Sequence, residues 1–325
     1  MKVMIIGLGS MGKRRIRLLK KYDSTIEIVG VDQSDNRRSV CESTFHIKVY
    51  ENTKDCLEHQ KIEVAFICSS PLTHKKLITE CLLHNVHVFS ELNLVSDGYD
   101  YNIELAKERQ KVLFLSSTFL YREEIIEISA LVKKTNNLVN YSYHVGQYLP
   151  DWHPWESYND FFVGNKKTNG CREIFAIELP WMIETFGEVI KFEVIKSKMS
   201  GLNIEYNDNY LLILEHSTGH KGMLAVDVVS RKAVRNLEIF GENLFLRWDG
   251  SPQGLVSYDI QLKEERKLKL YDKVDQLDAY SNFVVENAYY SEISAFFNVL
   301  NGVSKPIYDF EKDKEILKII DKIEA

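Results

Sequence analysis

The sequence lacks any apolar run of the roughly 18 to 20 residues that a membrane-spanning helix needs. Short runs such as residues 64–68 pass into polar residues at once. The amino-terminal apolar run is also too short for the core of a signal peptide, and it leads directly into a glycine pattern. We therefore expect a protein without a membrane span or an export signal, located in the cytoplasm.

Cysteine is scarce, with five residues in 325. An odd number without C-x-x-C or Cys/His spacing does not suit a disulfide framework or a metal site. We expect no metal ligands and reduced thiols, as is usual in a reducing compartment. The five are Cys41, Cys56, Cys68, Cys81 and Cys171.

An excess of positive charge is also missing, because 41 Lys and Arg face 47 Asp and Glu and give a net charge of −6. Such a chain has no general attraction to nucleic acid. Six basic residues do cluster at 13–21, where they alternate with Ile16, Leu18 and Leu19, and we interpret them as the solvated face of a helix. With 45% hydrophobic and 27% charged residues, the chain has the composition of a globular protein of about two domains.

The first 115 or so residues alternate β-rich runs with helical patterns. This rhythm predicts a parallel sheet with crossover helices. A helical face formed by residues 77, 78, 81 and 82 precedes one strand, and residues 97–110 predict a further helix. The predicted strands are residues 3–6, 26–31, 47–50, 64–68, 86–89 and 112–115.

Beyond residue 118 the runs become longer and the turns shorter. This change predicts an open, mostly antiparallel sheet, and residues 241–243 have the spacing of a hairpin turn. Two helices with apolar residues at helical spacing close the chain. We therefore expect an α/β domain over residues 1–118 and an α+β domain with flanking helices over residues 119–325. The predicted strands are residues 139–144, 210–216, 222–229, 237–240 and 244–248.

The segment from Gly7 to Gly12 reads G-x-G-x-x-G, between a predicted strand and a predicted helix. This context indicates a dinucleotide-binding Rossmann domain with a doubly wound parallel sheet. Gly7 permits the tight turn, Gly9 admits a pyrophosphate, and Gly12 lets the helix and strand pack closely. The helix amino terminus favours phosphate. The candidate cofactor residues here are Gly7, Leu8, Gly9, Ser10, Met11 and Gly12.

Asp32 follows Gly12 by twenty residues, at the end of the next predicted strand. A carboxylate there accepts hydrogen bonds from the adenosine ribose and repels a 2′-phosphate, so the sequence favours NAD(H) over NADP(H). Gln33 joins the candidate cofactor residues. Arg37 and Arg38 weaken the preference for NAD(H), because either arginine is placed to reach a 2′-phosphate.

With these motifs the whole chain resembles the Gfo/Idh/MocA family of oxidoreductases. The resemblance rests on residues 7–19, on residues 68–74 where the family has a T-P-x-x-x-H type segment, and on residues 87–91 leading into its E-K-P motif. It implies hydride transfer between NAD(P) and a carbohydrate, and in some members a transient oxidation during elimination or glycoside cleavage. It also implies a role at the cofactor for Cys68, Ser69, Ser70, Pro71, His74, Glu91 and Arg122.

Two positions depart from the family pattern. The chain reads Glu91-Leu92-Asn93 where the family has Glu-Lys-Pro, so the lysine that polarises the substrate oxygen is absent. Counting back nine residues from Phe186 places Ile177 at the family's histidine, and Pro180 stands at the following Asp. Neither leucine nor isoleucine transfers a proton, so a catalytic site here requires a rearranged acid/base group.

Residues 148–178 are rich in candidates for that role, and residues 151–158 resemble the tryptophan-containing substrate loop of family members from sugar-biosynthesis loci. Aromatic rings suit the apolar face of a sugar, and the charged groups suit hydroxyls, carboxylates or phosphates. The catalytic candidates are Glu173, His153, Lys166, Lys167 and Glu178. The substrate-binding candidates are Trp152, Trp155, Tyr158 and Arg172.

Three functions fit this pattern. The first is an NAD(P)-dependent oxidoreductase acting on a sugar, amino sugar or sugar nucleotide. The second is a dinucleotide-binding sensor or partner subunit without turnover, and the third is an NAD-assisted lyase or hydrolase. An open sheet also needs covering, so we expect a homodimer or homotetramer.

Overall fold

The computed structural model describes residues 1–153, 156–277 and 283–325, and the chain divides into two compact units. Unit 1 comprises Met1–Ser117 and Tyr289–Lys318, and unit 2 comprises Thr118–Ala288 and Ile319–Ala325. The sequence placed everything after residue 118 in the second domain. Residues 289–318 instead group with the first unit, where Phe296 packs against Phe66, Phe89 and Phe114.

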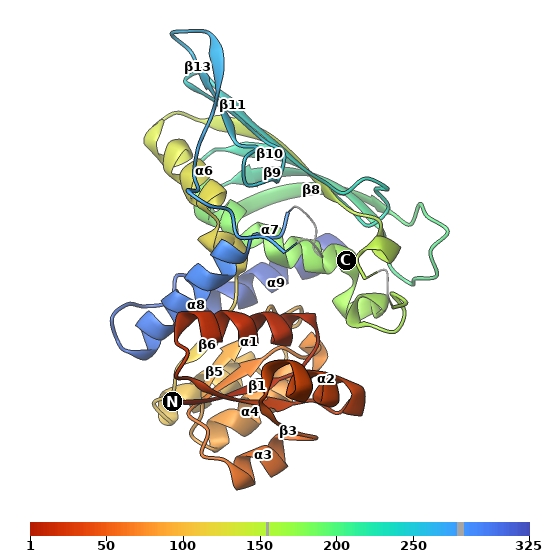
Figure 1. The fold of residues 1–325 in the computed structure, drawn as a ribbon. Helices are drawn as coiled ribbons and strands as arrows, with labels where there is room; N and C mark the ends of the chain where they lie inside the picture. Colours follow the sequence, from red (N-terminus) through yellow and green to blue (C-terminus); the bar gives the residue numbers. More distant parts are fainter. Residues whose placement is uncertain (154–155, 278–282) are drawn as a thin grey trace. The chain divides into compact units, whose positions relative to one another are not determined.

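Unit 1 contains a six-stranded parallel sheet in the order β3-β2-β1-β4-β5-β6. Helices lie on both faces of this sheet (Figure 1). The order reverses between β1 and β4, which is where doubly wound sheets bind their ligands. The strands are β1 (Lys2–Ile6), β2 (Glu27–Val31), β3 (Lys48–Tyr50), β4 (Val64–Ile67), β5 (His87–Ser90) and β6 (Leu113–Leu115).

The crossover helices of unit 1 follow the predicted β-α alternation. Apolar side chains on both faces of the strands are buried beneath them, as a parallel sheet requires. The helices are α1 (Ser10–Tyr22), α2 (Asp35–Phe45), α3 (Thr53–His59), α4 (Pro71–Leu83) and α5 (Tyr99–Glu108). Two further helices, α8 (Glu286–Leu300) and α9 (Phe310–Glu324), close the chain and pass from one unit to the other.

The basic face predicted for α1 is partly wrong. Arg14 is 3% exposed and Arg15 is completely buried. The reason is α8, whose Tyr289 lies under the guanidinium of Arg14 at 4.5 Å and whose Glu292 forms an ion pair with Arg15. Helix α8, near the carboxyl end of the chain, thus supplies the partners that offset the cost of burying these two charged side chains.

Unit 2 contains an eight-stranded sheet in the order β14-β13-β12-β11-β7-β10-β9-β8. All neighbours are antiparallel except β7 and β10, so the predicted mostly antiparallel sheet is confirmed. The predicted turn at residues 241–243 does join β11 to β12. The strands are β7 (Val139–Gly146), β8 (Val189–Ser197), β9 (Asn209–His216), β10 (Lys221–Asp227), β11 (Val234–Gly241), β12 (Leu244–Trp248), β13 (Val256–Asp259) and β14 (Glu264–Lys267).

Helices α6 (Glu123–Lys134) and α7 (Gly170–Phe186) lie along one face of this sheet (Figure 1). Alternate strand residues such as Tyr143, Leu212 and Leu224 are buried on that face. Short 3₁₀ turns complete the unit, namely η1 (Thr118–Tyr121), η2 (Leu149–Asp151), η3 (Phe162–Gly164) and η4 (Lys166–Thr168). No helix in the described part of the chain combines the length and the apolar character needed to cross a membrane.

Candidate functional site

The glycine-rich turn connects β1 to α1 at the carboxyl edge of the sheet. Gly7 has φ +93°, and a Cβ there would lie 2.8 Å from the backbone of Cys68 and Ser69. A Cβ on Gly12 would lie 1.9 Å from the carbonyl oxygen of Gly7. These two glycines are therefore required by the fold itself.

Gly9 is different, because a Cβ there would meet only the guanidinium of Arg37, at 3.9 Å. The fold leaves open space in front of Gly9, at the amino terminus of α1. Among the described residues no side chain caps this helix end. The amide groups of the first helical turn and the helix dipole favour an anion at this point, and a Cβ on residue 9 would project into the same space. Ser10 and Met11 form the first turn of α1 behind it.

Asp32 follows β2, with its carboxylate turned toward the glycine-rich turn. It accepts hydrogen bonds from the backbone amides of Leu8 and Ser34, each at 2.8 Å. The side chain of Arg37 is half exposed and lies 3.8 Å from the Asp32 carboxylate. Arg38 instead donates to the carbonyl oxygens of Asp32 and Gln33, so it holds the loop and is not directed at a ligand.

The segment after β4 forms a second wall of the same edge. Ser70 is the N-cap residue of α4 and Pro71 its first residue. Ser69 hydrogen-bonds the Thr73 hydroxyl at 2.8 Å. Burial raises the pKa of the Cys68 thiol well above its usual range, so this thiol is neutral and unreactive at neutral pH.

His74 joins this segment to the loop after β5. Its Nδ1 lies 2.5 Å from Oδ1 of Asn93, and its Nε2 lies 3.0 Å from the carbonyl oxygen of Ser69. Burial lowers the pKa of His74, which favours the neutral ring with a single N–H. The imidazole is a positioning group between these two loops.

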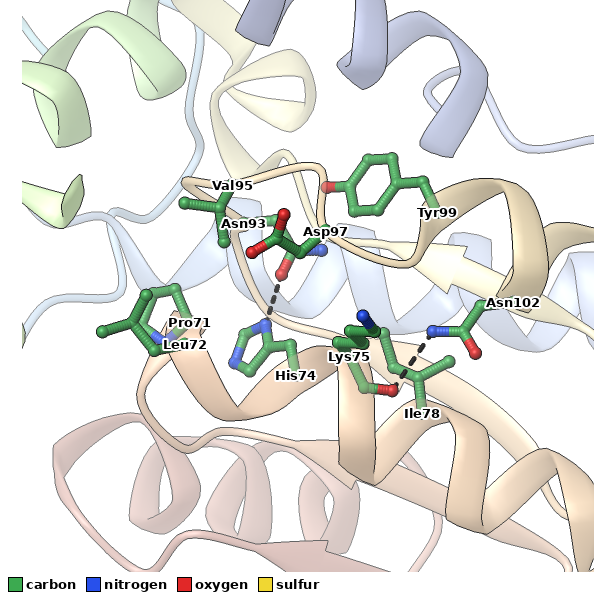
Figure 2. Close-up of a pocket in the computed structure, with 10 residues that line it drawn as sticks. All are labelled: Pro71, Leu72, His74, Lys75, Ile78, Asn93, Val95, Asp97, Tyr99 and Asn102. Carbon is green, nitrogen blue, oxygen red and sulfur yellow. Dashed lines mark hydrogen bonds between the residues drawn. The ribbon is translucent and has the colours of Figure 1, made fainter.

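A small pocket of about 50 Å³ adjoins this histidine (Figure 2). Its walls come from α4, the loop after β5 and the start of α5. Figure 2 shows His74 and Asn93 meeting at one side of the pocket, with Tyr99 and Asn102 on α5 at the other. The volume suits water molecules and is far below that of a carbohydrate site.

Glu91 is occupied by a buried ion-pair cluster. Its carboxylate contacts Arg15 Nε at 2.6 Å, and a second carboxylate, that of Glu292, contacts Arg15 Nη2 at 2.7 Å. Ser116 and the amide of Ser117 donate to Glu292 as well. Burial is the main cause that raises the pKa of Glu292, against the opposing charge of Arg15. The cluster fixes the ends of β5 and β6 beneath the predicted cofactor site.

Arg122 lies in unit 2, where its guanidinium is fully engaged. It pairs with Glu124 at 2.8 Å and donates to the carbonyl oxygens of Phe283 and Gly250. The side chain is 2% exposed and lies over the ring of Trp248. This arrangement favours a role in holding unit 2 together, and the cofactor role implied by the resemblance stays a prediction.

Glu173 lies in the first turn of α7, which Asn169 caps by accepting a hydrogen bond from the amide of Arg172. Its Oε2 is buried and makes no hydrogen bond to any described residue. Burial raises the pKa of Glu173 to about 8, so the carboxyl group is protonated at neutral pH. Ile177 and Pro180 follow at i+4 and i+7, on the same face of the helix.

Glu178 has a different environment one turn further along. Its carboxylate accepts hydrogen bonds from Tyr143, Trp181 and Arg235, the first two at 2.7 Å. With every acceptor position satisfied and no exposure, this side chain joins α7 to β7 and β11. The geometry therefore separates two glutamates that the sequence placed together, and only Glu173 has an unpaired carboxyl oxygen.

Three of the remaining candidates contact other residues of unit 2. Arg172 forms ion pairs with Asp321 and Glu324 of α9, and His153 contacts Glu156 at 2.7 Å and stacks on Phe161. Trp152 donates to the carbonyl oxygen of Gln147 at 3.1 Å and packs beside Gly170.

Lys166 and Lys167 are exposed on η4. Trp155 lies outside the described residues. Among those described, no group of three His, Cys, Asp or Glu side chains is placed to hold a metal ion.

Of the substrate candidates that the structure describes, Tyr158 lines a groove together with Tyr148 and Arg231. The sequence reasoning missed Tyr148, Arg231 and the positioning contact of Asn93. Arg231 follows β10 at a turn, and no local pattern marks it. The only available signal was that β7 and β10 end at the same edge of the sheet, which requires the topology.

The amino-terminal residues of the chain match a known protein family. Residues 1–117 match the family model GFO_IDH_MocA, described as an oxidoreductase family with an NAD-binding Rossmann fold. Residues 1–117 are thus similar to this family. The match covers the strands and helices that carry the glycine-rich turn, Asp32 and the segment around His74.

One curated relative, myo-inositol 2-dehydrogenase from Thermotoga maritima, is 31% identical over 117 residues. The alignment spans 35% of this chain and 35% of the relative, so this chain matches about a third of the relative's length.

Solved structures match along nearly the whole chain. Biliverdin reductase from Synechocystis, in complex with biliverdin and NADP⁺, has a TM-score of 0.76 at 17% identity and covers 99% of this chain and 97% of its own. The WlbA dehydrogenase from Bordetella pertussis, in complex with NADH and UDP-GlcNAcA, has a TM-score of 0.75 at 14% identity. The match covers 99% of this chain and 95% of the WlbA chain. At such identities these likenesses show that both units share the fold.

Proposed function

We propose that this chain is an NAD(P)-dependent oxidoreductase that transfers hydride to or from a sugar, amino sugar or sugar nucleotide. The observation that carries the proposal is the open space before Gly9, beside the Asp32 carboxylate, in a segment that is similar to an NAD-binding oxidoreductase family. The two-unit fold is shared with proteins that bind NADH with UDP-GlcNAcA and NADP⁺ with biliverdin.

The residues present fit the cofactor. The amide groups at the start of α1 would hold the diphosphate, and the Asp32 oxygens would accept from the adenosine ribose hydroxyls. When bound, the nicotinamide group supplies or accepts the hydride. Ser69, Ser70, Pro71 and His74 would shape the wall beside it, with His74 keeping the two loops in register.

We propose NAD(H) as the preferred cofactor. The Asp32 carboxylate lies where a 2′-phosphate would come, and like charges repel. Arg37 opposes this preference from 3.8 Å away. The Asp32 carboxylate is fixed by two backbone amides, whereas Arg37 is a half-exposed side chain, so the fixed negative charge carries more weight.

We propose Glu173 as the general acid in place of the family's lysine and histidine. Reduction of a carbonyl group requires a proton for the developing alkoxide, and a carboxyl group that stays protonated near neutral pH can donate it. The unpaired, buried Oε2 of Glu173 meets that requirement. In the oxidation direction the same group must first lose its proton, so the arrangement favours reduction at neutral pH.

Two alternatives remain testable against this proposal. A dinucleotide-binding sensor would bind NADH without turnover, and an NAD-assisted lyase or hydrolase would turn over without net change in absorbance at 340 nm. The sensor is suggested by the absence of the lysine and the histidine of the family pattern. The buried, protonated Glu173 favours the dehydrogenase, because a binding protein gains nothing from a destabilising carboxyl group.

We also propose that a second copy of this chain covers the outer face of the eight-stranded sheet. On this face Ile195, Leu211, Ile213 and Met223 are 49–75% exposed, and they are neighbours on β8, β9 and β10. Unpartnered aliphatic groups of this size on adjacent strands mark an interface.

The charges on this face suit a homodimer. Lys191, Glu215 and Lys221 alternate in sign across one cross-strand row. A two-fold axis would pair such a row with its own opposite charges.

The test of cofactor binding is the pair Gly9→Ala and Gly12→Ala, with NADH fluorescence as the readout. A Cβ at residue 9 meets no backbone atom, so Gly9→Ala should keep the fold and lose NADH affinity by tenfold or more. A Cβ at residue 12 overlaps Gly7, so Gly12→Ala should unfold unit 1. Undiminished NADH binding in folded Gly9→Ala would contradict the proposed diphosphate site at the start of α1.

A further inference from the structure

A groove of about 550 Å³ lies in unit 2. We call it the edge groove. The residues that line it are Tyr148, Pro150, Tyr158, Ser200, Gly201, Leu202, Val229 and Arg231.

The sheet topology explains why these residues meet. Strands β7 and β10 are parallel neighbours, so the loops that follow Gly146 and Asp227 leave the same edge of the sheet. Strand β8 also ends at this edge, because it is antiparallel to β9, whose first residue Asn209 pairs with Ser197. Three loops, after β7, β8 and β10, therefore converge, and the loop after β7 is the one predicted to contact substrate.

Arg231 supplies a positive charge whose position is defined. Its guanidinium lies 3.7 Å from the centre of the Tyr148 ring, within the range of a cation–π contact. Among the described residues no carboxylate forms an ion pair with Arg231. Arg231 is exposed, and stacking on Tyr148 orients the plane of its guanidinium, whose N–H donors suit carboxylate and phosphate oxygens.

The groove walls are held by their own hydrogen bonds. The Asp227 carboxylate accepts from the amides of Val229 and Ser230, at 2.9 and 2.7 Å, and so fixes the turn before Arg231. The Tyr158 hydroxyl accepts from the amide of Asn203 at 3.1 Å. Asp208 accepts from the amides of Met199 and Ser200 and so closes the loop after β8. A groove built in this way is preorganised for a ligand.

We propose that the edge groove binds the anionic group of a carbohydrate, a carboxylate or a phosphate, on Arg231, with the ring of the sugar against Tyr148 and Tyr158. This inference rests on the proposed function, which it narrows from carbohydrates in general to carbohydrates that carry an anionic group. Two aromatic faces and one guanidinium discriminate such a ligand from a neutral polyol, because only the anion gains charge-assisted hydrogen bonds.

The test is calorimetric titration of the full chain with glucuronate, glucose 6-phosphate and glucose, each with and without saturating NADH. We expect at least one of the two anionic sugars to bind at least tenfold more tightly than glucose. Glucuronate and glucose 6-phosphate separate the carboxylate from the phosphate. Arg231→Gln should remove the preference for the anion, and Arg231→Lys should restore only part of it.

Lys232→Gln is the matched control, because it removes the same charge from an exposed neighbour that does not line the groove. It should change the affinities less than twofold. Equal affinity for anionic and neutral sugars, or equal loss in both variants, would overturn the inference. NADH binding without anion binding would refute only the edge groove, and absence of NADH binding would refute the proposed function while leaving the sugar titration interpretable.

Discussion

Replacement of Glu173 by Gln should stabilise unit 2 at neutral pH and abolish the proton donor at the same time. Burial raises the pKa of Glu173 from its usual value near 4.5 to about 8. The folded state therefore keeps a proton that the unfolded state loses, and stability falls as the pH rises between these two values. Gln keeps the shape of the protonated carboxyl group and has no proton to lose.

The magnitude follows from the two pKa values. Ionisation of Glu173 in the unfolded state lowers the free energy of unfolding of the wild-type chain. The decrease is less than about 1 kcal/mol at pH 5 and about 3 kcal/mol at pH 7. The stability gain of Glu173→Gln should therefore grow by about 2 kcal/mol between pH 5 and pH 7. All four tryptophans lie in residues 118–288, so urea unfolding followed by tryptophan fluorescence reports on unit 2.

The activity of the variant gives the second readout. Wild-type reduction should fall as the pH rises through about 8, and Glu173→Gln should lose turnover while keeping NADH affinity. Glu184→Gln, on the exposed face of the same helix and paired with Lys133, is the control and should change stability by less than about 0.5 kcal/mol. A gain that is constant with pH, or full turnover in Glu173→Gln, would refute the reasoning.

Three further predictions concern other parts of the molecule. Asp32→Ala should weaken NADH binding and narrow the preference over NADPH in a fluorescence titration, and unchanged affinity for both would exclude Asp32. Arg15→Met leaves Glu91 and Glu292 buried without their cation, and urea unfolding should show a loss of about 3 to 5 kcal/mol. Ile213→Lys should convert a dimer to a monomer in analytical ultracentrifugation, whereas Ile260→Lys, an exposed control away from that face, should not.

Much of unit 1 was predictable from local patterns. Strand, glycine-rich turn, helix and acidic residue follow one another within 32 residues, and each one constrains the next. The hairpin turn at residues 241–243 was predictable for the same reason. In each case the information lies in neighbouring residues.

The features that sequence reasoning missed depend on residues far apart in the chain. The burial of Arg15 requires Glu292, which is 277 residues away, and the difference between Glu173 and Glu178 depends on Tyr143 and Arg235. The edge groove requires β7 and β10 to be parallel neighbours, which no local pattern indicates. The side-chain chemistry of the charged and aromatic residues in unit 2 indicates which of them are candidates for the site. The sequence does not indicate which residues form hydrogen bonds or ion pairs with them.

The most direct test of the whole account is a calorimetric titration of the purified chain with NADH and, in parallel, with NADPH. The account predicts that both bind at one site per chain, that NADH binds more tightly, and that Gly9→Ala loses both. Binding of neither dinucleotide to the folded wild-type chain would contradict the assignment of the glycine-rich turn and, with it, the proposed oxidoreductase.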